Sequence, residues 1–374
     1  MRLAGEKLRR ARLVEGPIEF ARAVFECPCC RRSLAPLDLE LGLGPHENLS
    51  RLTQKKVAYA AARGSFGQAA RDLAHQAEIE VSAAEVARVA EQAGRALEAL
   101  QREREAGWNE PVGGDHRVAE PERTCERLVI EADATSALTV KGEENKMVYV
   151  ATAFDAASRG KKESSDRPYL AERRYAASAE EDFEDFRARL RALAHRMGAR
   201  GAKEVAFVGD GAPCLWNLAE ELFPGAVLIQ DPWHVFDRLG SLLRELTGPD
   251  KPEPREQLEA WKATVLDSRV QEVIDQLREW RGKRRGKARE RLDEEIHYLE
   301  RSRHRMDYAR YKAAGWPIGS GAIEGGCKHL VKERFGVTGA RWKRRRIPFV
   351  LALRLSQFNE EWENDWATAL RPAA

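Results

Sequence analysis

The chain has 374 residues, enough for two or three domains, and 43% of them are apolar, so it can bury a sizeable core. Charged residues make up 33% but the formal net charge is only +3, so a surface that binds a polyanion must be a local one. No window resembles a membrane span or a secretory signal. The six cysteines are scattered rather than arranged as a disulfide framework. We therefore expect a cytoplasmic protein without a membrane partner.

Residues 1–45 contain one cysteine-rich turn, Cys27-Pro28-Cys29-Cys30. A CxxC pair supplies two of the four ligands that a structural zinc ion requires, and no second pair lies nearby in the sequence. We expect an incomplete zinc-ribbon-like turn without structural Zn²⁺. The alternative is that a second chain supplies the missing ligands.

Residues 46–110 are predicted to be helical. Ser65–Gln68 and Ser82–Glu85 both fit the capping box that starts a helix. Apolar residues then recur at helical spacing after the second box, at Val86, Val89, Ala90, Ala93 and Leu97. Two helices separated by a break at 77–81 are compatible with a helix-turn-helix, whose second helix enters the DNA major groove. The alternative to a helix-turn-helix is an ordinary helical bundle. A linker is predicted after these helices, at residues 111–126.

From residue 126 onward the pattern is that of alternating strands and helices. Three antiparallel strands are predicted first, at 128–132, 137–140 and 147–154, followed by helix, strand, helix and strand as far as residue 234. This order predicts a mixed α/β sheet. Residues 235–312 are expected to form a helical insertion. Residues 313–374 are expected to return as C-terminal helices.

Three acidic residues stand at positions where α/β proteins collect ligands. Asp133 ends the first predicted strand, Asp210 ends the strand after the long helix, and Glu324 lies at the start of a late helix. Carboxylates brought together repel one another, and a divalent cation removes that repulsion. Mg²⁺ prefers oxygen ligands, and two ions about 4 Å apart can hold the attacking and leaving oxygens of a phosphodiester displacement.

Basic residues follow Glu324 and are candidate contacts to DNA phosphates, which would position DNA without reading its sequence. Trp342 lies among them, either to stack on a base or to join the core. The candidate cations are Lys328, Lys332, Arg334, Arg341, Lys343, Arg344, Arg345 and Arg346. A second basic run at 281–287 is either a phosphate clamp or a solvated face.

Several stretches resemble bacterial insertion-sequence transposases of the DDE type, most closely the ISKra group. The matching stretches are EADATS, FVGDGAPCLW, IQDPWHV and PIGSGAIEGGCKHLVKERFGVTGARW, with CPCCRRSLAPLD and SFGQAARDLA nearer the N-terminus. The resemblance implies an RNase H-like catalytic domain in which Asp133, Asp210 and Glu324 are the catalytic metal ligands. It also implies that His234 lies near the scissile phosphate, as in the Asp/Cys-x-x-His motif of Mutator-like transposases. A structural histidine is the alternative.

The function implied by this resemblance is cleavage and strand transfer at the ends of an insertion sequence. Two Mg²⁺ ions are the implied cofactors, with Mn²⁺ as a substitute. The implied partners are double-stranded DNA, as terminal inverted repeats and target, and further copies of the chain. Asp133 is followed by Ala134, where the group usually has glycine. The alternatives are a catalytically inactive DNA-binding regulator and an RNase H-like nuclease that cuts RNA–DNA hybrids.

Overall fold

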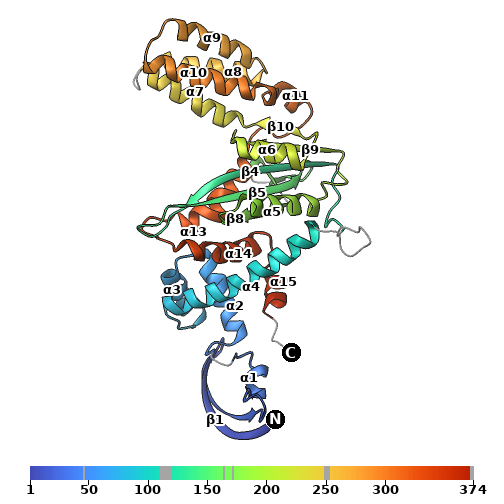
Figure 1. The fold of residues 1–374 in the computed structure, drawn as a ribbon, viewed down its shortest axis with the longest axis vertical. Coiled ribbons are helices and arrows are strands. Elements are labelled where there is room, and N and C mark those ends of the chain that lie inside the picture. Colours follow the sequence, from blue (N-terminus) through green and yellow to red (C-terminus); the bar gives the residue numbers. More distant parts are fainter. Residues whose placement is uncertain (45–46, 110–119, 163–164, 171, 248–252, 371–374) are drawn as a thin grey trace.

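The computed structural model describes residues 1–44, 47–109, 120–162, 165–170, 172–247 and 253–370. A helical unit, a β-sheet, a second helical unit and a β-hairpin follow one another along the long axis (Figure 1). Most of the predicted linker at 111–126 lies outside the described residues. None of the described helices is both long and apolar enough to cross a membrane.

The N-terminal segment is a β-ribbon that was not predicted from the sequence. Strands β1 (Arg2–Leu13) and β2 (Gly16–Glu26) pair antiparallel, and the short β3 (Ser33–Leu34) joins β2 before helix α1 (Pro36–Glu40). Most of β1 is exposed, so the apolar alternation that reveals a half-buried strand is missing. The cysteine turn connects β2 to β3. Its thiols join no three-ligand cluster among the described residues, and the zinc prediction stays a prediction.

Three helices come next in the chain, and their starts confirm both predicted capping boxes. They are α2 (Arg51–Arg63), α3 (Phe66–Ala77) and α4 (Ala83–Asn109). The Gln68 N–H donates to Ser65 Oγ at 3.1 Å, and the Glu85 N–H donates to Ser82 Oγ at 3.1 Å. The predicted apolar row of α4 is buried. Whether these helices bind DNA stays a prediction.

The central sheet is five-stranded and mixed, which confirms the α/β class. Its order is β10-β9-β4-β5-β8. The strands are β4 (Arg127–Ala137), β5 (Lys146–Asp155), β8 (Arg173–Ser178), β9 (Glu204–Gly209) and β10 (Val227–Gln230). The β4–β5 and β5–β8 pairs are antiparallel, whereas β4–β9 and β9–β10 are parallel. A small two-stranded sheet, β6 (Arg159–Lys162) and β7 (Ser165–Leu170), lies between β5 and β8 in the sequence.

The prediction of a separate strand at 137–140 is wrong. Strand β4 continues through Asp133 to Ala137, because its pairing with β5 extends to Ala137 opposite Lys146. Asp133 therefore does not end the strand. Beyond β4, Thr139 makes only an isolated bridge to Trp342. The third antiparallel strand is β8 instead.

Helices cover both faces of the sheet. One face packs against α5 (Phe183–Arg196) and α6 (Pro213–Leu222). The opposite face is shared by two groups of helices. Over β5 and β8 lie α12 (Gly321–Gly326) and the π-helix Cys327–Lys332, and over β9 and β10 lies the helical insertion.

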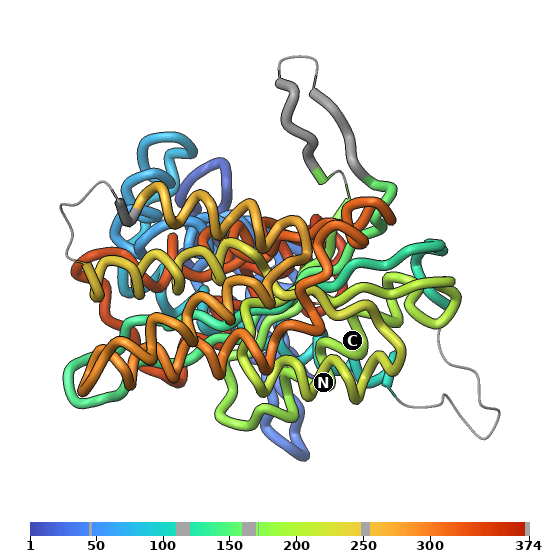
Figure 2. Tube along the Cα trace, turned by 90° about the horizontal axis from the view of Figure 1, so that it is seen from above, coloured from blue at the N-terminus to red at the C-terminus, as the bar shows by residue number. Residues whose placement is uncertain are grey.

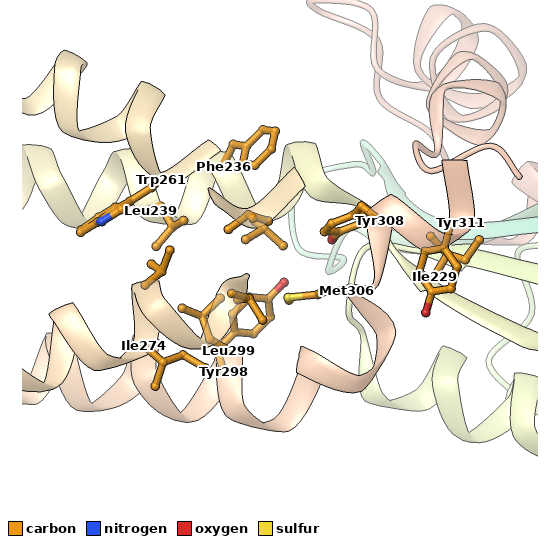
Figure 3. Close-up of a cluster of buried hydrophobic side chains, with 14 of the residues drawn as sticks. Ile229, Phe236, Leu239, Trp261, Ile274, Tyr298, Leu299, Met306, Tyr308 and Tyr311 are labelled. Atoms are coloured by element: carbon orange, nitrogen blue, oxygen red, sulfur yellow. The ribbon is translucent and has the colours of Figure 1, made fainter. Parts of the chain in front are cut away.

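The insertion is an up-and-down helical bundle that begins earlier than predicted, at Pro232. It comprises α7 (Pro232–Thr247), α8 (Glu253–Leu266), α9 (Val270–Gly282), α10 (Lys287–Ser302) and the short α11 (Tyr308–Ala313). Figure 2 shows α7–α10 running side by side. Their core joins that of the sheet, since Ile229 of β10 packs in the same cluster as Trp261, Tyr298 and Tyr308 (Figure 3).

The last part of the chain returns to helices α2–α4. The π-helix leads into α13 (Glu333–Phe335), then α14 (Ile347–Phe358) and α15 (Trp362–Ala369). Helix α14 crosses α4 so closely that a Cβ at Gly94 would lie 2.4 Å from the Phe349 carbonyl oxygen. No rotamer change relieves a clash with backbone, so this contact requires glycine.

We predict that Gly94→Ala destabilises the protein although alanine favours helix. The overpacking cost of about 1–3 kcal/mol outweighs the helix-propensity gain of about 1 kcal/mol. Gly107→Ala, on the same helix with nothing within 4 Å of the added Cβ, is the matched control. Urea denaturation should show a lower free energy of unfolding for Gly94→Ala and an equal or higher one for Gly107→Ala. Equal effects of the two changes would contradict the close crossing of α4 and α14.

Candidate functional site

Three aspartates lie at the same edge of the sheet. In the parallel register Glu131 pairs with Val208 and Gln230 pairs with Gly209. Continuing this register brings Asp133 opposite Asp210, and Asp210 opposite Asp231. Neighbouring strands lie about 4.8 Å apart. We call Asp133, Asp210 and Asp231 the strand-end aspartates, because Asp210 and Asp231 directly follow β9 and β10 and Asp133 lies level with them within β4.

The strand-end aspartates point to the face of the sheet that carries the insertion. Side chains alternate between the two faces of a strand. Val129, Val208 and Ile229 all pack into the insertion core, and each aspartate is an even number of residues beyond one of them. Because α12 and the insertion divide this face between them, the carboxylates lie where the two groups of helices meet.

Glu324 joins this site from α12. One ligand atom each from Asp231, His234 and Glu324 lie within 4.8 Å of one another. Asp231 is buried, His234 is half-buried and Glu324 is exposed. The site thus combines strand ends with the first turn of α7 and with α12. The grouping of Glu324 with Asp231 was not predicted from the sequence.

Asp231 is tightly held by protein donors. The backbone N–H of Ser320 donates to Asp231 Oδ2 at 2.8 Å, and the Ser320 hydroxyl donates to the same oxygen. The Trp233 N–H donates to Oδ1 at 2.6 Å. These bonds tie the end of β10 to the start of α12. An ionised carboxylate accepts about four hydrogen bonds, so Asp231 retains some capacity for a ligand.

Asp133 and Asp210 are held more loosely. Asp133 Oδ1 accepts the Ala134 N–H at 2.6 Å, and the Cys327 thiol lies 3.6 Å from Oδ2. Asp210 Oδ1 accepts the Ala212 N–H at 3.1 Å. Burial and the nearby charge of Asp210 raise the pKa of Asp133, while His234 opposes the shift. The negative charge of Asp210 therefore disfavours ionisation of Asp133 on the neighbouring strand.

A fifth carboxyl group, Glu131, lies beneath the site and was also not predicted. Its side chain is buried, and Oε2 accepts the Ile323 N–H at 2.8 Å. Burial raises the pKa of Glu131 to about 8. Glu131, on the central strand, thereby caps the first turn of α12. This hydrogen bond helps to position Glu324, the next residue, relative to the sheet.

This set of groups suits a divalent cation. Asp133 and Asp210 are half-buried, and Glu324 is exposed. Partial burial and the charge of Asp210 raise the pKa of Asp133. A cation would remove the repulsion between the acids. Oxygen donors with open positions fit Mg²⁺, and the imidazole of His234 fits Mn²⁺ equally well. Of the predicted ligands, only Glu324 belongs to the three-ligand group found among the described residues, and Asp133 and Asp210 lie beside that group on the neighbouring strands.

The helix after Glu324 is irregular. Residues Cys327–Lys332 form a π-helix, a geometry that often marks functional sites. The buried guanidinium of Arg354 donates to the carbonyl oxygens of His329, Leu330 and Ala62. Arg354 therefore stabilises the widened turn and joins it to the end of α2.

Two of the predicted DNA contacts are wrong, because their side chains are buried. Arg334 is 3% exposed, donates to the Ala61 carbonyl oxygen, and lies over the ring of Trp342. Burial and the charge of Arg354 lower the pKa of Arg334 to about 9. Trp342 is 6% exposed and packs edge-on against Phe335. Both residues belong to the core.

The other predicted cations line the surface after Glu324. Lys328, Lys332, Arg341, Lys343 and Arg345 are exposed. Arg344 is half-buried and forms an ion pair with Glu181 at 2.6 Å. We call the five exposed residues the C-terminal cations.

Trp233 is the aromatic residue that the site does expose. It lies between Asp231 and His234, and 56% of its surface is exposed. Its ring packs over Gly319, where a Cβ would lie 2.9 Å from Cζ3. Base stacking was one of two alternatives for Trp342, and its buried position supports the other, a place in the core. The motif Asp231-Pro232-Trp233-His234 already placed Trp233 beside a site residue.

A comparison with protein-family models and another with curated proteins each found no match for this chain.

We predict that two of the strand-end aspartates contribute differently to stability. Asp231→Ala removes the acceptor of three hydrogen bonds and should lower the free energy of unfolding by roughly 3 kcal/mol. Asp210→Asn keeps the shape but removes a repulsive charge. Without divalent ions it should change stability by less than about 1 kcal/mol. Chemical denaturation in EDTA measures both.

Adding Mn²⁺ separates the two roles further. The wild-type melting temperature should rise with Mn²⁺ concentration, because a ligand that binds only the folded state stabilises it. Asp210→Asn should lose this rise. If Asp210→Asn responds to Mn²⁺ like the wild type, Asp210 is not a metal ligand.

Proposed function

We propose that this chain is a DDE transposase with an RNase H-like catalytic domain, acting on the ends of an insertion sequence. The observation that carries the proposal is that Asp133, Asp210 and Glu324 lie on elements that meet at one edge of the sheet. They approach from strand ends and a helix separated by up to 191 residues of sequence, from 133 to 324. Their neighbours Asp231 and His234 complete a site that is rich in oxygen donors.

The sheet supports the RNase H-like part of the proposal. The central strand β4 has the antiparallel pair β5 and β8 on one side and the parallel strands β9 and β10 on the other. The RNase H-like domain that the resemblance implies is likewise a mixed sheet, and in this chain only β5 runs against the other four strands. The acids stand on the central strand and at the ends of the strands parallel to it, where ligands gather in α/β sheets.

The chemistry needs only water, a 3′-hydroxyl and DNA. Water attacks the phosphorus at the element end, the bond to the 3′ oxygen breaks, and that oxygen leaves as a 3′-hydroxyl. The hydroxyl then attacks a target phosphate and displaces the target's own 3′ oxygen. Two bound divalent cations would stabilise the attacking and leaving oxygens. Asp133 and Asp210 would hold the cations between them, and Glu324 would complete one site.

The surroundings of the carboxylates suit a nucleic acid. The C-terminal cations follow Glu324 along the chain and can neutralise phosphates. His234 lies within reach of the same site and can donate to a phosphate oxygen. The exposed ring of Trp233 can stack on an unpaired base, an interaction worth about 1–3 kcal/mol. The helices α2–α4 would recognise the terminal repeats.

We predict that the full-length protein joins DNA carrying the element ends to target DNA in Mg²⁺ or Mn²⁺. Asp133→Ala, Asp210→Ala and Glu324→Ala should each lower the rate by about three orders of magnitude or more. Gel-based strand-transfer assays measure joined products. Gly107→Ala, which is remote from the site, serves as the active control.

The same assay distinguishes the alternatives. An inactive regulator binds the ends but joins nothing under any metal condition. An RNase H-like nuclease cuts RNA–DNA hybrid without requiring an element end. Joining activity that survives Asp210→Ala would exclude the proposed metal ligands.

We predict that the exposed cations contribute to DNA affinity. Replacing Lys343 and Arg345 together by glutamine should reduce the slope of log K against log salt by about 2, close to one unit per phosphate contact. Arg334→Gln should leave that slope unchanged, because Arg334 is buried, and should lower stability instead. Fluorescence anisotropy over a range of NaCl concentrations measures the slope. A larger slope change for Arg334→Gln would reverse the assignment of these residues.

A further inference from the structure

The far end of the insertion carries a dense group of cations that the catalytic site does not use. Residues 281–290 read RGKRRGKARE, with six cations and one acid. Five of these cations, Lys283, Arg284, Arg285, Lys287 and Arg289, are exposed. We call them the insertion tip. None of the five forms an ion pair within the part of the chain that the structure describes.

The sides of the same bundle are different. Cations there are commonly paired with acids, on the same helix or a neighbouring one. Examples are Arg238 with Glu295, Lys262 with Glu259, Arg269 with Glu272, Arg278 with Glu300, and Arg291 with Glu245. Even Arg281, at the edge of the tip, pairs with Asp293. The unpaired charge is therefore concentrated at the tip and is not a general property of the insertion.

The position of the tip is also electrostatically unfavourable. Lys287 and Arg289 lie in the first turn of α10, whose N-cap Gly286 supplies no side-chain acceptor. Cations at a helix N-terminus oppose the helix dipole, at a cost of about 0.3–1 kcal/mol each. The five like charges, all within residues 283–289, also repel one another. An anionic partner with closely spaced charges would remove both costs, and duplex DNA carries one charge per roughly 1.7 Å of its axis.

The bundle places the tip at a definite distance from the carboxylates. Helix α7 leaves the site at Pro232, and α10 returns toward it, so that the Tyr298 hydroxyl lies beside Gly211, the residue after Asp210. The loop between α9 and α10 is therefore at the distal end (Figures 1 and 2). Helix α10 has 16 residues, which makes it about 24 Å long at 1.5 Å per residue. At about 3.4 Å per base pair, this length corresponds to roughly seven base pairs.

We propose that the insertion tip is a second DNA-backbone contact, which binds duplex phosphates several base pairs from the catalytic carboxylates. The inference rests on the proposed function, since it takes DNA as the substrate. The contact is with phosphates only, so it adds affinity without sequence preference. Through this contact, the insertion holds the DNA duplex in line with the catalytic carboxylates.

The test compares two double variants of the full-length protein that remove equal charge from the same insertion. Arg284→Gln with Arg285→Gln removes tip charges. Arg269→Gln with Arg278→Gln removes cations that are exposed but paired. The probe is a fluorescein-labelled duplex of arbitrary sequence, about three helical turns long, and anisotropy is recorded from low to high NaCl. Circular dichroism melts check that both variants fold.

The tip variant should reduce the slope of log K against log salt by about 2, and the paired-cation variant should leave it unchanged. Equal slopes for the tip variant and the wild type overturn the tip contact but leave the catalytic proposal standing. Equal losses for the two double variants also overturn it, because the effect would then be one of total charge. A wild-type protein that does not bind the duplex at all overturns the proposed function together with the tip contact.

Discussion

The hydrogen bonds between Asp231 and Ser320 are the contact on which the rest of the site depends. The chain leaves the sheet at Asp231, builds the insertion, and returns at Ser320, 89 residues later. A single carboxylate accepts two donors of Ser320 and so joins the two ends of that excursion. The bundle can then be large without displacing the C-terminal helices. Helix α12 starts over the sheet, where Glu131 accepts the Ile323 N–H, and Glu324 is held beside the strand-end aspartates.

The same arrangement concentrates negative charge, and the acids fall into two groups with different surroundings. Asp231 and Glu131 are buried and hydrogen-bonded to backbone N–H groups, so their charge or proton is accommodated within the protein. Asp133, Asp210 and Glu324 are nearer the solvent and have fewer protein donors. Carboxylates kept close together without enough donors are unfavourable unless a cation binds. This division into buried, hydrogen-bonded acids and more open acids is compatible with the proposed cation site.

Much of the sheet could be predicted from the sequence, because buried strands and capping boxes have local signals. Strands β9 and β10 lie within a residue or two of their predicted positions, and Ser65 and Ser82 cap the helices as expected. The end of β4 could not be predicted, since it depends on pairing with β5 further along the chain. The β1–β2 ribbon was missed for a related reason. Its strands are stabilised by each other and bury little apolar surface, so no periodic pattern marks them.

The candidate site was predicted in some of its acids but not in Asp231 or in its supports. Asp133, Asp210 and Glu324 could be chosen because each follows a predicted strand or begins a helix, although β4 in fact continues beyond Asp133. Glu131 could not, since an acid inside an apolar strand has no local sign that a distant helix N-terminus will meet it. Arg334 and Trp342 were misassigned for the converse reason. A cation in a basic run is normally exposed, and only the packing of α2 against the segment after the π-helix buries this one.

Buried Arg334 and its neighbour Arg354 also link helix α2 to the segment that follows Glu324. Arg334 and Arg354 both donate to carbonyl oxygens at the end of α2, at Ala61 and Ala62. Arg354 donates as well to the π-helix that follows Glu324. Positive charge at a helix C-terminus is favourable, so each guanidinium is stabilised by carbonyl oxygens. The helices proposed to recognise DNA ends and the segment that follows Glu324 are therefore joined by two buried guanidinium groups, so a displacement of α2 would strain the hydrogen bonds that hold this segment.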